Sequence, residues 1–159
     1  MLPLIMNLSG CTQNITISNT NTGKLVSFIV QIDKKGFSNK RDLEARLFNS
    51  EQIKQSEQQA NCSISFDATT GKETTSCPPG VTYKPVTPET FKFKIDDIKE
   101  NISFKSASVK TGEKFRLMLS GLSTDNCNTA SASVEKTADS ENMNITGLLW
   151  AQTELGCQP

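Results

Sequence analysis

The sequence predicts a mainly β protein, an antiparallel β-sandwich or barrel-like sheet with one short helix and two disulfides. Short stretches of alternating apolar and polar residues recur about every ten residues with turn signals between them, a pattern typical of such folds. Apolar residues make up only 35% of the 159 residues, below the roughly 45–50% of an average domain even when glycine is allowed for. A core this thin is more plausible when cross-links help to hold it.

Two strands are expected at the start of the chain. Ile15 and Ile17 alternate with polar residues within 12–19, and residues 25–32 are apolar almost throughout. The Thr-Asn-Thr-Gly turn signal at 20–23 lies between them, so we expect a hairpin. The nearly continuous apolar run at 25–32 is typical of a strand that is covered on both faces.

The one helix is expected within residues 38–60. Leu43 and Leu47 lie at helical spacing, and the charged residues around them are good helix formers. The pattern therefore places the helix at 41–48. Residues 51–59 are nearly all polar, which fits either a solvated helix or a loop.

A disulfide-linked hairpin is expected next. Cys62, Ile64 and Phe66 alternate with polar residues, as in a strand, and Thr-Thr-Gly-Lys at 69–72 is a turn signal. A chain that folds back there brings Cys77 opposite Cys62. We therefore predict a bond between these two cysteines.

Residues 78–88 are expected to form an extended connection inside a single β-rich domain that spans 12–159. Four of the six prolines fall in this stretch. Proline removes an amide donor and fixes φ, so it fits an extended or edge segment.

Strands are expected throughout the second half of the chain. Their apolar positions alternate with polar ones, and they are Phe91, Phe93 and Ile95, then Ile102 and Phe104, then Phe115, Leu117 and Leu119, then Ala130, Ala132 and Val134, then Met143 and Ile145. Trp150 is the only tryptophan, and we interpret it as a core aromatic residue.

The five cysteines are interpreted as structural. None lies in a Cys-x-x-Cys motif, so neither a zinc site nor a redox motif is indicated. With Cys11 set aside, three pairings of the other four exist. We favour Cys62–Cys77 and Cys127–Cys157 as two disulfides, which implies an oxidising compartment outside the cytoplasm.

Cys11 differs from the others in its context. It ends the string Leu8-Ser9-Gly10-Cys11 after a short apolar run, and this string resembles the lipobox of bacterial lipoproteins. The resemblance implies that residues 1–11 are a signal segment and that Cys11 carries a lipid which anchors the chain to a membrane. No Lys or Arg precedes the run, although a signal peptide carries a positive start. The alternative is that residues 1–10 form a first strand or an ordered tail.

Composition excludes several classes of chemistry. The chain has no histidine, so Ser-His-Asp and Cys-His catalysis and imidazole metal sites are ruled out within it. Lys plus Arg and Asp plus Glu both number 17, and a neutral chain has no general attraction for nucleic acid. We therefore expect no cofactor, no metal and no nucleic-acid partner.

Two local patterns partly match motifs of catalytic or calcium-binding sites, and neither match is complete. Asp96, Asp97 and Glu100 form an acidic cluster after a strand, but they lack the spacing of a calcium loop and fit a solvated turn. Ser133 and Lys136 match the Ser-x-x-Lys string of some hydrolases, but the supporting motifs are not in place. The sequence therefore predicts a protein that is not an enzyme.

The expected function is that of an exported, surface-anchored lipoprotein that binds a protein or cell-surface partner or supports envelope assembly. The alternative is a structural subunit of an extracellular filament or adhesin, which self-assembles. A disulfide loop near the C-terminus, here Cys127 to Cys157, resembles that of pilin-like proteins. An apolar N-terminal strand could also insert into a neighbour's sheet.

Overall fold

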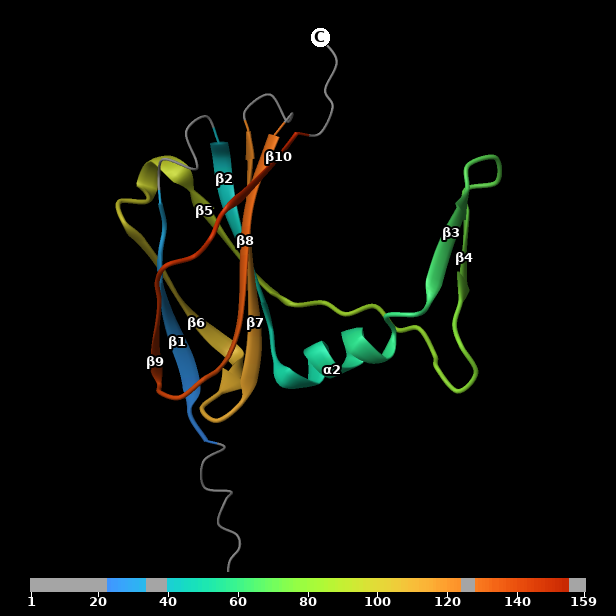
Figure 1. The fold of residues 1–159 in the computed structure, drawn as a ribbon, viewed down its shortest axis with the longest axis horizontal. Helices are drawn as coiled ribbons and strands as arrows, with labels where there is room; N and C mark the ends of the chain where they lie inside the picture. The colour runs from blue at the N-terminus through green and yellow to red at the C-terminus, as the bar shows by residue number, and fades with distance from the viewer. Residues whose placement is uncertain (1–22, 34–39, 124–127, 155–159) are drawn as a thin grey trace, which may run out of the picture.

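The chain forms a β-sandwich from which a two-stranded hairpin projects (Figure 1). The computed structural model describes residues 23–33, 40–123 and 128–154. Within these residues one sheet has the order β6-β1-β9, a second has the order β10-β8-β7-β2-β5, and β3 pairs only with β4. The predicted mainly β sandwich with one short helix is confirmed.

The three-stranded sheet is built around the first described strand. Its members are β1 (Leu25–Gln31), β6 (Asn101–Lys110) and β9 (Asn142–Ile145). β1 runs antiparallel to β6 and parallel to β9. The sheet is therefore not antiparallel throughout.

The burial of β1 differs from the prediction. Val26, Phe28 and Val30 are fully buried, whereas Leu25 and Ile29 are 37% and 40% exposed. The expectation of a strand covered on both faces is wrong, because side chains alternate across the sheet and only one face packs on the core.

Only the second strand of the predicted hairpin, 25–32, falls among the described residues. Ser27 to Val30 pair with β6 on one edge and with β9 on the other. Residues 12–19 themselves lie outside the part of the chain that the structure describes.

The five-stranded sheet is antiparallel throughout. Its strands are β2 (Lys40–Phe48), β5 (Glu89–Lys94), β7 (Lys114–Ser123), β8 (Asn128–Thr137) and β10 (Ala151–Glu154). A 3₁₀ turn, η4 (Ile95–Asp97), follows β5. The strands predicted in the second half of the chain are confirmed, except that Ile95, predicted to continue the strand of Phe91 and Phe93, lies in η4.

The helix lies later in the chain than predicted. Residues 41–48 belong to strand β2, and the helix α2 is Ser50–Gln58. Leu43 and Leu47 are four residues apart, a spacing that fits one face of a strand as well as one face of a helix. Ala45 between them is also fully buried, and this period of two identifies a strand.

The helix α2 begins with a strong cap. The Asn49 side chain accepts a hydrogen bond from the Gln52 amide at 2.9 Å, and the Gln52 side chain accepts one from the Asn49 amide at 3.0 Å. This reciprocal pair satisfies two amide donors at the helix start. Ile53 is 2% exposed and anchors an otherwise polar helix.

Aromatic rings join the two sheets across the core. Phe28 stacks on Phe104 with ring centroids 5.3 Å apart and meets the edge of Phe115 at 5.0 Å. Phe91 stacks on Phe104 at 4.4 Å. Trp150 is partly buried and packs against the same core, which fits its interpretation as a core aromatic residue.

The Glu89 carboxylate links the two sheets at one edge of the sandwich. Glu89 begins β5 and accepts hydrogen bonds from the Ser106 hydroxyl and the Ala107 amide, both at 2.8 Å, and from the Ser108 hydroxyl. These three donors lie on β6, where the register with β1 is interrupted. Glu89 therefore ties the edge strand of one sheet to the edge strand of the other.

No helix in the described ranges 23–33, 40–123 and 128–154 has the length and apolar character needed to cross a membrane.

Candidate functional site

The hairpin arm, residues 62–77, projects from the sandwich and is the first candidate surface. It consists of β3 (Ser63–Asp67) and β4 (Lys72–Ser76). Figure 1 shows it standing away from the sandwich at the far end of α2. The predicted disulfide between Cys62 and Cys77 is present and closes the base of the arm.

One face of the hairpin arm carries its two large apolar residues, and for brevity we call it the apolar face. Ile64 lies opposite Thr75, and Phe66 lies opposite Glu73, so these four side chains share one face. Ile64 is 47% exposed and Phe66 is 68% exposed. The other face carries only polar residues, namely Ser63, Ser65, Asp67, Lys72, Thr74 and Ser76.

The tip of the hairpin arm is fixed by an aspartate. The Asp67 carboxylate accepts hydrogen bonds from the amides of Thr69 at 2.8 Å and Thr70 at 3.3 Å. These bonds, that from Thr69 first, lower the pKa of Asp67 below its ordinary value. Gly71 then closes the turn with a φ of +70°, a conformation that side chains disfavour.

Glutamines of α2 and of its C-cap bind the connection that follows the hairpin arm. The amide groups of Gln52 and Gln55 donate to the carbonyls of Thr87 at 2.7 Å and Lys84 at 3.1 Å. The side-chain oxygen of Gln59 accepts from the Lys84 amide. The proline-containing connection at 78–88 has neither helix nor strand, in agreement with the prediction. It is bound to the helix that leads into the arm.

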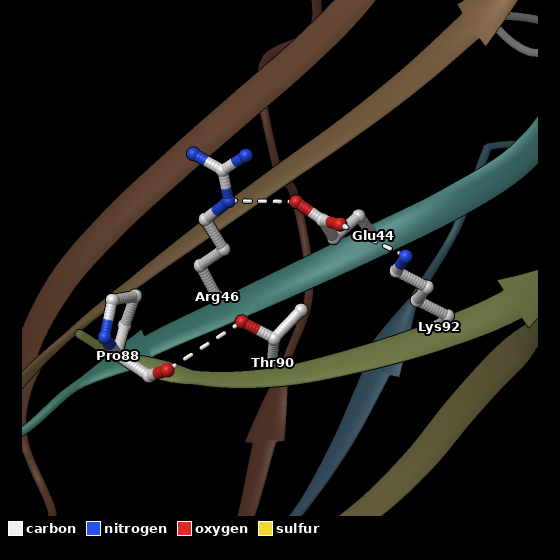
Figure 2. Close-up of polar contacts among 5 residues, drawn as sticks. All are labelled: Glu44, Arg46, Pro88, Thr90 and Lys92. Atoms are coloured by element: carbon white, nitrogen blue, oxygen red, sulfur yellow. Dashed lines mark hydrogen bonds and ion pairs between the residues drawn. The ribbon is translucent and has the colours of Figure 1, made fainter.

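The outer face of the five-stranded sheet is the second candidate surface. Figure 2 shows the Arg46 Nε donating to Glu44 at 2.7 Å, with the Lys92 ammonium 4.0 Å from the same carboxylate. The Thr90 hydroxyl donates to the Pro88 carbonyl at 3.5 Å. Within the described residues, no interaction occupies the two terminal nitrogens of Arg46.

In a second group of charges on this face, two cations share one carboxylate. Glu135 lies 3.2 Å from the Lys114 ammonium and 2.8 Å from the Arg116 guanidinium. Hydrogen bonds from Lys114 first, and then from Arg116, lower the pKa of Glu135 below its ordinary value. These two cations are therefore already engaged with a partner, unlike the terminal nitrogens of Arg46.

A hollow of about 310 Å³ lies between these charged groups. We call it the sheet hollow, and its lining residues are Arg46, Met118, Leu119, Ser120, Ser131, Ala132, Ser133, Leu149 and Ala151. Serines form much of its floor. Met118 is 42% exposed and Leu149 is 90% exposed, so the hollow offers apolar surface beside Arg46.

Of the site residues predicted from sequence, the structure brings together Cys62 and Cys77. Cys11, the predicted lipidation site, lies outside the described residues. So do Cys127 and Cys157, so their predicted bond stays a prediction.

The two patterns weighed for catalysis form no centre in the described part of the chain. Asp96, Asp97 and Glu100 are exposed around η4, and no group of His, Cys, Asp or Glu there could hold a metal ion. Ser133 and Lys136 are three residues apart on β8. Because strand side chains alternate, the two project to opposite faces.

Sequence reasoning missed the sheet hollow and the anchoring of α2. The apolar residues at the hollow come from β7, β8, β10 and the segment before β10, and no local spacing links them. Met118 carried a usable signal, because it is an apolar residue that follows Lys114 and Arg116 in one outward row of β7.

No family model, no curated protein and no solved structure matches this chain.

Proposed function

We propose that this chain is an exported, non-catalytic binding protein of the cell envelope and that the hairpin arm is its contact with a protein partner. The observation that carries the proposal is the exposure of Ile64 and Phe66 on one face of a covalently closed hairpin. Burying apolar area of this kind is the main favourable term in most protein–protein association.

The build of the hairpin arm supports a binding role. An isolated two-stranded hairpin is marginally stable in water. The bond between Cys62 and Cys77, 15 residues apart, stabilises such a loop by about 3 kcal/mol on the chain-entropy model. A hairpin that needs a cross-link, yet leaves its apolar face uncovered, is better suited to presenting that face than to completing the core.

The same bond supports an oxidising compartment. Disulfides persist in oxidising environments and are rare in the cytoplasm, so the proposal places the protein outside the cytoplasm. A diacylglyceryl group on Cys11, as the lipobox resemblance implies, would hold it at the outer face of a membrane. Two acyl chains suffice for stable anchoring.

Photo-crosslinking in the cells that produce the protein tests the proposal. A photoreactive amino acid at position 64 or 66 should yield discrete protein adducts after irradiation, identified by mass spectrometry. The matched controls are positions 65 and 74, which lie on the polar face of the same hairpin and should yield few. Equal yields from both faces, or no protein adduct from either, would contradict a partner on the apolar face.

A further inference from the structure

We infer that the partner of the hairpin arm is a second copy of this chain, and that the arm of one copy seats in the sheet hollow of the next. The inference rests on the proposed function and names the partner of the same surface. It joins two features that lie at separate places on one molecule, the apolar face of the arm and the hollow on the five-stranded sheet.

The two surfaces match in size and in polarity. Phe66 and Leu149 are the most exposed large apolar residues in the described part of the chain, at 68% and 90%, and each belongs to one of the two surfaces. A cavity of about 150 Å³ accommodates benzene. The sheet hollow, at about 310 Å³, therefore has room for the Phe66 ring against Met118 and Leu149.

The charges beside these apolar groups are complementary. Glu73 lies directly opposite Phe66 on the hairpin arm, and no described residue forms an ion pair with its carboxylate. Arg46 lies directly opposite Met118 on the sheet. With Phe66 in the sheet hollow, the Glu73 carboxylate comes next to the terminal nitrogens of Arg46, and planar carboxylate–guanidinium pairing is favourable there.

The arm stands away from the sandwich of its own molecule, and the connection that follows the arm is bound to α2. The glutamines of α2 bind the connection at Lys84 and Thr87, and Figure 1 shows the arm held away from the sandwich. The contact therefore forms between copies. Because it joins two different surfaces, it is a head-to-tail interface that generates rings or open filaments.

Sedimentation velocity of the full, disulfide-bonded chain over a range of concentrations tests the inference. The unaltered chain should associate in a concentration-dependent way. Phe66→Ser and Met118→Lys should each weaken association at least about tenfold, as for the loss of an interface anchor. Ser65→Lys, on the polar face of the same arm, is the matched control and should associate normally.

Mixing the two variants separates this geometry from others. The Phe66→Ser chain keeps an intact sheet hollow, and the Met118→Lys chain keeps an intact arm. Each alone should be monomeric, whereas an equimolar mixture should form a 1:1 complex that grows no further. The charge pair gives a second check, because Glu73→Arg and Arg46→Glu should each weaken association, and the two changes together in one chain should restore it.

Four outcomes would overturn the inference. They are a monomer at all concentrations, association that Phe66→Ser leaves unchanged, a mixture of the two variants that remains monomeric, and Phe66-dependent flotation with phosphatidylglycerol vesicles in place of self-association. If position 66 crosslinks to a different protein in cells, the inference fails while the proposed function stands. If position 66 also yields no protein adduct, the proposed function fails as well.

Discussion

At the scale of single residues, carboxylates stabilise parts of this fold through several hydrogen bonds each. Glu89 accepts hydrogen bonds from three groups on β6 and so closes the edge between the sheets. Asp67 accepts from two amides and so sets the tip of the hairpin arm. Hydrogen bonds to charged acceptors are shorter and stronger than those between neutral groups.

The Asp67 turn should respond to acid. Because its pKa in the folded arm lies below the ordinary aspartate value of 3.8, the carboxylate stabilises the turn fully above that value. The contribution is lost as pH falls through the folded pKa. NMR titration should show the Asp67 carboxyl group and the Thr69 amide shifting together, with a midpoint below 3.8.

The control for this titration is Asp67→Asn, in which the Thr69 amide shift should not follow that titration. A midpoint at or above the ordinary value, or a Thr69 amide that does not follow the carboxyl group, would show that the carboxylate does not hold the turn.

At the scale of elements, the helix α2 is positioned more by polar side chains than by apolar contacts. Ile53 is its one buried residue. Three glutamines bind it instead to the extended connection at 84–87. These contacts hold the connection that follows the base of the hairpin arm.

A single substitution should loosen this junction. Gln59→Ala removes the acceptor of the Lys84 amide while keeping a good helix former. The loss of about 1 kcal/mol corresponds to roughly fivefold faster exchange of that amide, measured by hydrogen exchange with NMR detection.

The matched control is Gln58→Ala, because Gln58 is exposed on the same helix. It should leave exchange at Lys84 unchanged. Equal exchange rates in the two variants would mean that the glutamine contact does not hold the connection.

The same scale shows what the sequence could predict. Alternation located β5, β6, β7, β8 and β9, and the turn signal at 69–72 located the hairpin arm with its disulfide. The helix was misplaced because Leu43 and Leu47 satisfy both a period of two and a period near four, and strand pairing with β5 and β7 decided the outcome. The capping box at Asn49 was the local signal for the true helix start.

The candidate site was only partly predictable for a related reason. Alternation identifies two faces of a strand but does not say which face meets the core. Phe66 and Ile64 follow the same pattern as the buried residues of β1, yet they are exposed because no second layer covers the arm. The sheet hollow joins residues of β2, β7, β8 and the segment before β10, and a contact between such distant segments exists only in the folded chain.

At the scale of the whole molecule, a sandwich with a modest core carries an arm whose apolar face is left open. The core supplies a rigid base, and the disulfide keeps the arm folded without a second layer. We therefore predict that the face of the hairpin arm that carries Phe66 is exposed to solvent in the isolated protein and is covered by a partner in the producing cells.

Hydroxyl-radical footprinting tests this claim most directly, by comparing Phe66 in dilute purified protein with Phe66 in the intact producing cells. Ile29 serves as the internal reference, because it is 40% exposed on the outer face of the three-stranded sheet. We expect Phe66 to be modified severalfold less in cells than in the purified monomer, with little change at Ile29. Equal modification of Phe66 in both settings would contradict the hairpin arm as the binding element.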